Sequence, residues 1–174
     1  SGNVIYWYES GQRKAEGFFK LIYQKSRLES LRDSTYKEWF PNGNLSQKGE
    51  YYYGVKNGIW TSYFPEGDKW RVVQYNNGKD HPAEGWNKER EQTMIAGQGI
   101  IYDYYDNGPL KSKMAVTDSL YNGMAEYYHN NGNLESEGSL LNGEKNGLWK
   151  YYFEGGEKWK HIEYLNGKLD GGIK

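Results

Sequence analysis

The side chains with catalytic or metal-binding potential are few and lie far apart in this sequence of 174 residues. The chain has no Cys, which excludes a thiol nucleophile, a thiolate metal site and a disulfide. Its three His, which are His81, His129 and His161, lack the His-x-x-x-His spacing of a metal site. The Gly-Gln-Gly segment at 97–99 is too short for a phosphate-binding loop. We therefore expect a protein that is not an enzyme and that binds neither a metal nor a cofactor.

Four carboxylates recur at matching places, namely Glu9, Glu66, Asp106 and Glu154. Each precedes a Gly in a turn-like segment, where acidic side chains are solvated. Acid–base catalysis needs two groups positioned around one substrate, and a turn periodicity does not indicate such a pair. No Ser-His-Asp arrangement is indicated either. His129 occupies an aromatic position of the same pattern, so we expect it to stack or to form a hydrogen bond.

Aromatic rings dominate the apolar content of the chain. The 18 Tyr and 7 Trp sum to 25, as do the Leu, Ile and Val residues together. Each ring buries about 150–250 Å², so the sequence predicts folding on rings rather than on a broad aliphatic core. Rings left exposed would suit partner binding, because they combine a rigid surface with one polar atom. For each of these rings, the alternative to partner binding is a place in the core. The candidate binding rings are Trp39, Trp60, Tyr63, Trp70, Trp86, Tyr104, Tyr128, Trp149, Tyr152 and Trp159.

Charge and hydropathy exclude two classes of partner. The formal net charge of −1 supplies no field that would attract nucleic acid. No run of 18 apolar residues exists, so we expect no transmembrane segment. The chain starts Ser-Gly-Asn, with neither Met nor a signal segment. If a signal segment has been removed, we expect a secreted, periplasmic or surface-anchored protein, and otherwise a cytoplasmic one.

A repeat with a period of 24 residues organises the chain. Its element is two ring-bearing residues, two spacers and a Gly. The Gly intervals are 32, 24, 41, 24 and 24, which indicates one period with insertions of eight and 17 residues, within 17–35 and 79–98. The repeat units are centred on Gly11, Gly43, Gly67, Gly108, Gly132 and Gly156.

Each unit has the sequence of a β-hairpin. The aromatic run at 149–153 favours a strand, and Glu154-Gly155-Gly156 favours a turn. A second run follows over 158–165 and ends at Asn166-Gly167, a strong turn signal. A lone hairpin is not stable in water, so the hairpins must stack. The predicted fold is all-β: an elongated, twisted antiparallel meander of about six stacked hairpin repeats in a single domain over 1–174. The predicted turn glycines are Gly43, Gly58, Gly67, Gly78, Gly108, Gly123, Gly132, Gly143, Gly147, Gly156, Gly167 and Gly171.

The two insertions depart from the period. The first holds Leu21, Ile22, Leu28 and Leu31, which favours a longer hairpin, with a hydrophobic partner contact as the alternative. The second runs from 87 to 96 without Gly or Pro, which predicts one possible short helix. Asn87 would cap this helix, Gly97 would end it, and Trp86, Met94 and Ile95 would pack onto the sheet. The second insertion is equally consistent with a binding loop and with a plain surface loop.

The repeat resembles a known family. The unit from Asn146 to Gly156, closing over 166–171, is similar to the variant MORN repeat, and so is the unit from Asn57 to Gly67. The resemblance covers about residues 4 to 171 outside the insertions. It implies hairpin repeats with a binding surface and does not imply catalysis. Bacterial proteins built from this repeat are often labelled YwqK-like antitoxin components of toxin–antitoxin pairs.

These inferences leave two functions open. The first is a non-enzymatic scaffold for protein–protein interaction, antitoxin-like in one form, whose partner is another protein. The alternative is binding of carbohydrate or the cell envelope, with exposed rings stacked on the faces of a glycan.

Overall fold

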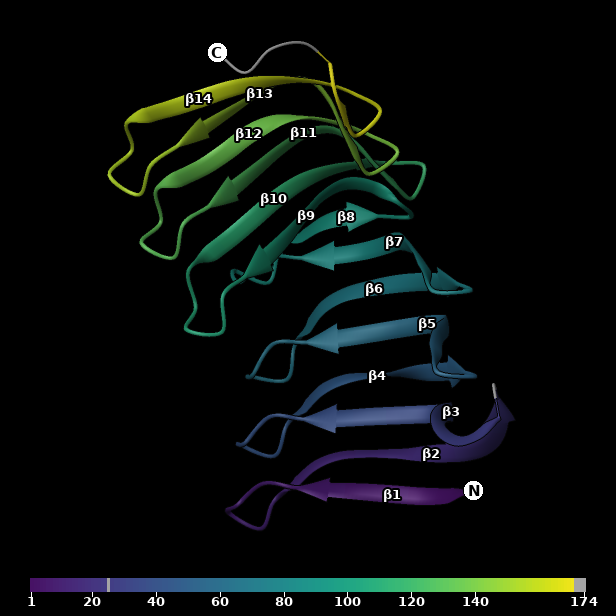
Figure 1. Cartoon of the computed structure of the whole chain (residues 1–174). Coiled ribbons are helices and arrows are strands. Elements are labelled where there is room, and N and C mark those ends of the chain that lie inside the picture. Colours follow the sequence, from purple (N-terminus) through teal and green to yellow (C-terminus); the bar gives the residue numbers. More distant parts are fainter. Residues whose placement is uncertain (25, 171–174) are drawn as a thin grey trace. The chain divides into compact units, whose positions relative to one another are not determined.

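The computed structural model describes residues 1–24 and 26–170. Their regular structure consists of 15 β-strands and no helix (Figure 1). The strands are β1 (Gly2–Trp7), β2 (Arg13–Gln24), β3 (Arg27–Trp39), β4 (Leu45–Tyr52), β5 (Val55–Tyr63), β6 (Lys69–Asn76), β7 (Lys79–Trp86), β8 (Gln92–Ile95), β9 (Gln98–Tyr104), β10 (Leu110–Thr117), β11 (Leu120–Tyr128), β12 (Leu134–Leu141), β13 (Glu144–Tyr152), β14 (Lys158–Leu165) and β15 (Lys168–Leu169).

The strand order in the sheet is the order in the sequence, from β1 to β15. Neighbouring strands are antiparallel, as in the pairs β1–β2 and β13–β14. The prediction of an all-β antiparallel meander of hairpin repeats is therefore confirmed. Among the described residues, no helix has the length and apolar character needed to span a membrane.

Contacts divide the chain into two compact units. Unit 1 comprises Ser1–Ala83 and Lys88–Arg90, and unit 2 comprises Glu84–Asn87 and the residues from Glu91 onward. The single repeat domain over 1–174 stays a prediction.

Two kinds of connection join the strands. At one, a two-residue turn has positive φ at both positions, as at Asn142 (53°) and Gly143 (86°), which matches the twist of the flanking strands. At the other, a strand-ending ring pair leads into a longer loop. There the Gly67 N–H donates to the Phe64 carbonyl, and the Phe64 N–H donates to the Asp68 carbonyl. The ring-pair loops hold Gly43, Gly67, Gly108, Gly132 and Gly156, whereas the two-residue turns hold Gly78, Gly143 and Gly167.

Among the described residues, the third Gly of a repeat lies inside a strand instead of in the predicted turn. Gly58, Gly123 and Gly147 belong to β5, β11 and β13, and Gly171 lies outside the described residues. In β5, Gly58 has a φ of 69°, and the ladder shifts from the Lys48–Thr61 pair to the Glu50–Asn57 pair. The extra residues of β5 form a β-bulge, for which a Gly in the left-handed region is well suited. An Asn-Gly pair alone does not distinguish a bulge from a turn.

The bulges at Gly58 and Gly147 each precede a buried indole. Trp60 and Trp149 are 2% and 0% exposed. Each ring covers a strand Gly, because an added Cβ would lie 2.3 Å from the Trp60 ring at Gly49 and 2.5 Å from the Trp149 ring at Gly138. The indole N–H groups donate to the carbonyls of Glu50 (2.9 Å) and Ser139 (3.0 Å). The core of these two repeats is therefore an indole packed against a strand position that has no side chain.

One repeat replaces this Gly–Trp pair by Met and Ala. Ala125 stands 24 residues before Trp149, and Met114 stands 24 residues before Gly138. Ala125 is fully buried and pairs across the strands with Met114. This repeat thus also pairs a small residue with a large one. Here the large residue, Met114, lies in the first strand of the pair and the small residue, Ala125, lies in the second.

The prediction of a helix over 87–96 is wrong. The segment is a loop followed by β8, in which Met94 is 1% exposed. Asn87 closes the loop: its side-chain Oδ1 accepts from the Glu91 backbone N–H (2.9 Å), and its backbone N–H donates to the Glu91 carbonyl (3.0 Å). Asn side chains favour turns and helix caps for the same reason, since both use a local side-chain acceptor.

The eight-residue insertion lengthens the β2–β3 hairpin. Its pairs run from Phe18–Asp33 to Gln24–Arg27. This is the longer hairpin that the sequence favoured.

Candidate interaction surface

One face of unit 1 carries a cluster of aromatic rings. The Tyr51 ring meets Tyr36 and Trp60 edge-on, at centroid distances of 5.4 and 5.0 Å, and Tyr75 lies 6.3 Å from Trp60. We call this side of the sheet the aromatic face. Tyr36 and Trp60 are buried, and burial is the main reason why the pKa of Tyr36 is raised. The cluster is a core formed by neighbouring repeats.

Basic side chains cover these rings. The Lys56 Nζ lies 3.9 Å from the centroid of the Trp60 ring, and the Arg32 guanidinium carbon lies 4.9 Å from that of Tyr36. Such contacts contribute about 0.5–2 kcal/mol each. Burial lowers the pKa of Lys56, and the positive charge of Arg71 lowers it further. The basic groups shield the rings from water, so the aromatic face is largely closed to a partner.

Unit 2 repeats the arrangement. The Lys145 Nζ lies 4.4 Å from the Trp149 ring and 5.0 Å from the Tyr151 ring. The Tyr151 and Tyr164 hydroxyls are joined by a hydrogen bond of 2.9 Å. The pKa of Tyr164 is raised, first by this hydrogen bond and then by burial. These polar atoms are already satisfied within the repeat.

The candidate binding rings fall into three groups by exposure. Trp60 and Trp149 are core side chains and offer no area to a partner. Trp159 is 55% exposed and packs beside Phe153, with the ring centroids 5.5 Å apart. The half-buried rings are Trp39, Tyr63, Trp70, Trp86, Tyr104, Tyr128 and Tyr152.

The ring-pair loops are tied to one another by their polar atoms. The Tyr8 hydroxyl donates to the Trp39 carbonyl (2.7 Å), and the Tyr105 hydroxyl donates to the Tyr128 carbonyl (2.6 Å). His129 has the equivalent contact, with its Nε2 3.1 Å from the carbonyl oxygen of Tyr152. The sequence expectation of a hydrogen-bonding His is thus met. In these three pairs the second ring therefore links its loop to the next repeat.

Carboxylates in unit 2 are held in ion pairs. Glu137 accepts from the Tyr152 hydroxyl (2.8 Å) and from the Lys150 Nζ (3.1 Å). These hydrogen bonds, Tyr152 first, lower the pKa of Glu137. Glu126 likewise binds the Lys113 Nζ at 2.8 Å. Each carboxylate stabilises a cross-strand pair. Within the described ranges, no group of three or more His, Cys, Asp or Glu is placed to hold a metal ion.

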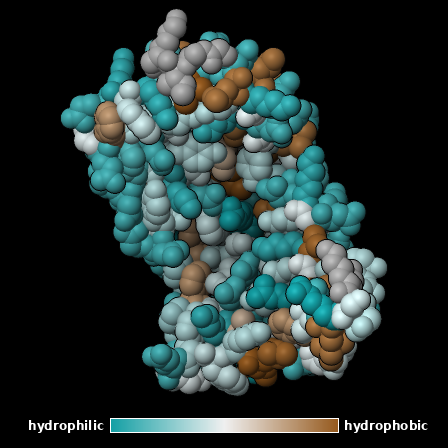
Figure 2. Space-filling model, in the orientation of Figure 1, coloured by the Kyte–Doolittle hydropathy of each residue, from teal (hydrophilic) through white to brown (hydrophobic). Residues whose placement is uncertain are grey.

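Several strongly exposed apolar side chains of unit 1 lie outside the repeating ring positions. Tyr23, Leu28, Tyr52 and Leu21 are 75%, 65%, 62% and 49% exposed, and all belong to the strand ends opposite the ring-pair loops. Figure 2 shows hydrophobic residues gathered near the β2–β3 hairpin. Tyr23, Leu28 and Leu21 lie in the insertion and Tyr52 precedes a turn, so none occupies the repeating ring positions. We call these four side chains the apolar patch.

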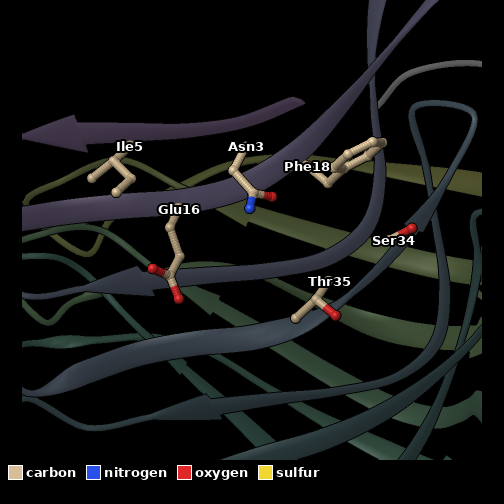
Figure 3. Close-up of a pocket in the computed structure, with 7 residues that line it drawn as sticks. Asn3, Ile5, Glu16, Phe18, Ser34 and Thr35 are labelled. Atoms are coloured by element: carbon tan, nitrogen blue, oxygen red, sulfur yellow. The ribbon is translucent and has the colours of Figure 1, made fainter. Parts of the chain in front are cut away.

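A shallow hollow of about 420 Å³ lies on the same unit, opposite the aromatic face (Figure 3). Its lining mixes hydroxyl, amide, carboxylate and apolar groups from β1, β2 and β3. Ser34 has a φ of 62°, in the left-handed region, and stands 24 residues before Gly58 of the β5 bulge. The lining residues are Asn3, Ile5, Glu16, Gly17, Phe18, Ser34 and Thr35.

Comparison with known proteins agrees with the repeat geometry. The family model of the MORN repeat variant matches residues 1–21, 32–51, 56–77 and 121–142. The first three segments lie in unit 1 and the fourth in unit 2. A comparison with curated proteins gives no match.

Proposed function

The chain belongs to the variant MORN repeat family, and from this premise we propose that it is a non-enzymatic scaffold that binds another protein. The observation that carries the proposal is the apolar patch of Leu21, Tyr23, Leu28 and Tyr52, which is exposed at one end of the strands of unit 1. Leu21, Tyr23 and Leu28 lie on one face of the β2–β3 hairpin, and Tyr52 lies on the neighbouring strand β4. Exposed apolar side chains gathered in one region mark interaction sites in soluble proteins.

The repeat core supports this proposal by contrast. Its indoles are buried, its ring hydroxyls donate to carbonyls of the next repeat, and its carboxylates are paired. Side chains with those roles stabilise the sheet and have little left to offer a partner. The apolar patch has no such role, since Tyr23 and Leu28 lie beyond the repeats.

The proposal is tested by isolating the protein at natural abundance from the cells that produce it. We expect it to elute with a second protein in fixed stoichiometry, as measured by native mass spectrometry. Tyr52→Ser should release that protein without changing the free energy of unfolding by more than about 0.5 kcal/mol, because Tyr52 is exposed. The matched control is Leu148→Ser in unit 2, which removes a side chain that is 47% exposed and should leave the complex intact. A protein that is always isolated alone contradicts the proposal.

Antitoxin-like action would be one form of this binding, in which the scaffold covers the active site of a toxin. It would require that the copurified protein arrest growth when produced alone and lose this effect when produced with the scaffold. If the copurified protein is harmless, the scaffold function still stands and the antitoxin-like action is ruled out.

Glycan binding is the second candidate function, and the hollow on β1–β3 favours it. The hollow presents the Asn3 amide and the Thr35 hydroxyl beside the Phe18 ring, a combination of polar groups and an apolar surface that suits a sugar. Calorimetric titration with a panel of mono- and oligosaccharides tests this function. Binding that is lost in Thr35→Ala supports it, and an absence of heat across the panel rules it out.

A further inference from the structure

The strands of the β2–β3 hairpin extend past their neighbouring strands (Figure 1). On one side, β1 pairs with β2 only as far as Phe19, after which the Leu21 N–H donates to the Ser1 hydroxyl. On the other side, the β4–β5 turn meets β3 at Arg32, whose carbonyl accepts from the Gly54 N–H at 2.7 Å. Residues 20–24 and 27–31 therefore form two paired strands without a further neighbouring strand among the described residues, and we call the segment 20–31 the finger.

One face of the finger is braced by unit 1. The Lys20 Nζ contacts the Tyr53 hydroxyl at 3.0 Å and lies 4.5 Å from the centroid of the same ring. Leu31, the cross-strand partner of Lys20, packs against Gly54. A two-stranded hairpin is at best marginally stable in water, so these contacts account for its order. Their residues face the β4–β5 turn.

The other face of the finger is free. Tyr23 and Leu28 are cross-strand partners, and Leu21 lies two residues from Tyr23, so the three side chains share this face. They are also the most exposed apolar groups of the finger, at 75%, 65% and 49%. Burying a side chain of this size contributes about 1.5–3 kcal/mol. The finger therefore presents a compact apolar surface in one direction only.

The finger is basic, although the whole chain has a net charge of −1. Residues 20–31 contain three basic residues, Lys20, Lys25 and Arg27, against one acidic residue, Glu29. Arg27 is largely exposed and pairs with Glu29 at 2.6 Å. Exposed ion pairs contribute only about 0–1 kcal/mol, so the Arg27 guanidinium is available to a carboxylate of a partner.

We propose that the finger inserts Leu21, Tyr23 and Leu28 into an apolar pocket of a protein whose pocket rim is acidic. The inference rests on the proposed scaffold function and identifies the segment and the chemistry of its partner. Two copies of the finger would bring like charges together, which disfavours a second copy of this chain as the occupant. Three apolar side chains and two excess positive charges also fall short of the anchoring that a lipid surface requires.

The test places a photoreactive group in the finger. Tyr23→p-benzoylphenylalanine is introduced into the full chain in the cells that produce it, and Leu148→p-benzoylphenylalanine is the matched control. Irradiation should link position 23, but not position 148, to one protein with an acidic surface. A lipid adduct, a self-adduct or no adduct at position 23 overturns the inference.

Affinity measurements with the cross-linked protein complete the test. Arg27→Glu should weaken binding about tenfold or more at low salt, and the difference should shrink as salt is added. The combined variant Leu21→Ser/Tyr23→Ser/Leu28→Ser should abolish binding with the circular dichroism of the sheet unchanged. If this variant keeps the partner while Tyr52→Ser loses it, the finger inference fails and the scaffold function stands. If no partner exists, both fail.

Discussion

At the scale of single residues, the fold depends on glycines whose missing Cβ makes room for a ring. Gly49 is the clearest case, because its hydrogen occupies the space next to the Trp60 indole. Gly2 offers a contrast, since an added Cβ there would meet no atom within 4 Å. The two positions differ in packing, which makes their substitutions a direct comparison.

Gly49→Ala should destabilise the protein by about 1–3 kcal/mol, because the methyl group forces the indole out of its place. Guanidinium denaturation followed by Trp fluorescence measures the change. Gly2→Ala should alter the free energy of unfolding by less than about 0.5 kcal/mol. Equal effects of the two substitutions would show that the Gly–indole fit is unimportant.

The natural exchange at Met114 and Ala125 suggests a rescue. The double variant Gly49→Met/Trp60→Ala reproduces that pair in unit 1. We expect it to be more stable than the sum of the single substitutions implies, with a coupling of about 0.5–3 kcal/mol between the two positions. Strictly additive effects would contradict the volume exchange.

Ser34 carries backbone strain, because its φ of 62° is unfavourable for a residue with a Cβ. Ser34→Gly should therefore stabilise the protein by about 0.5–1 kcal/mol. Ser62→Gly, at a position of β5 that is paired with Gln47 on one side and with Arg71 on the other, should instead destabilise it by a similar amount. Chemical denaturation of both variants tests the signs, and a destabilising Ser34→Gly would contradict the assignment of strain.

At the scale of the strands, the pairing of β12 with β13 is linked to pH. Hydrogen bonds from Tyr152 and Lys150 lower the pKa of Glu137 below its ordinary value of 4.5. The unfolded chain therefore binds the proton more readily than the folded chain does. The contribution of Glu137 to stability is present above about pH 4.5 and is lost as the pH falls through the folded pKa.

Glu137→Gln should lower the free energy of unfolding at pH 7 and flatten its decline below pH 4.5. Glu135→Gln, at an exposed position of the same strand, is the control for the loss of one carboxylate charge. Denaturant midpoints measured from pH 7 to pH 3 supply the profiles. Parallel curves for Glu137→Gln and the wild type would contradict the linkage.

The strands and their two-residue turns were predictable from the sequence, because ring-rich runs and pairs such as Asn166-Gly167 specify them locally. The bulge at Gly58 was not, since its role becomes clear only beside the indole that it positions. The helix over 87–96 was a wrong prediction for a related reason: Asn87 supplies the same local acceptor in a loop as in a helix cap.

Which of the individual rings are exposed could not be predicted from the sequence either. Trp60 and Trp159 are the same residue type, yet one is buried and the other is largely exposed. Exposure depends on which neighbours cover a ring, and those neighbours come from adjacent repeats. The insertion gave the better signal for exposed apolar side chains, because Leu21 and Leu28 have no place in the 24-residue pattern and are both exposed.

At the scale of the whole molecule, the repeats and the insertion have different roles. The repeats supply stability through indoles, ring hydroxyls and paired carboxylates that bind within the sheet. The apolar patch and the finger supply the proposed recognition. Substitutions in the first group should change unfolding, and substitutions in the second should change partner binding with the fold intact.

Hydrogen exchange of the protein alone and in complex with its partner tests this division most directly. The account predicts slower exchange on binding at the amides of residues 20–31 and 51–54, and unchanged exchange in the ring-pair loops at 39–44 and 63–68. Protection of the ring-pair loops, with residues 20–31 unchanged, would contradict it.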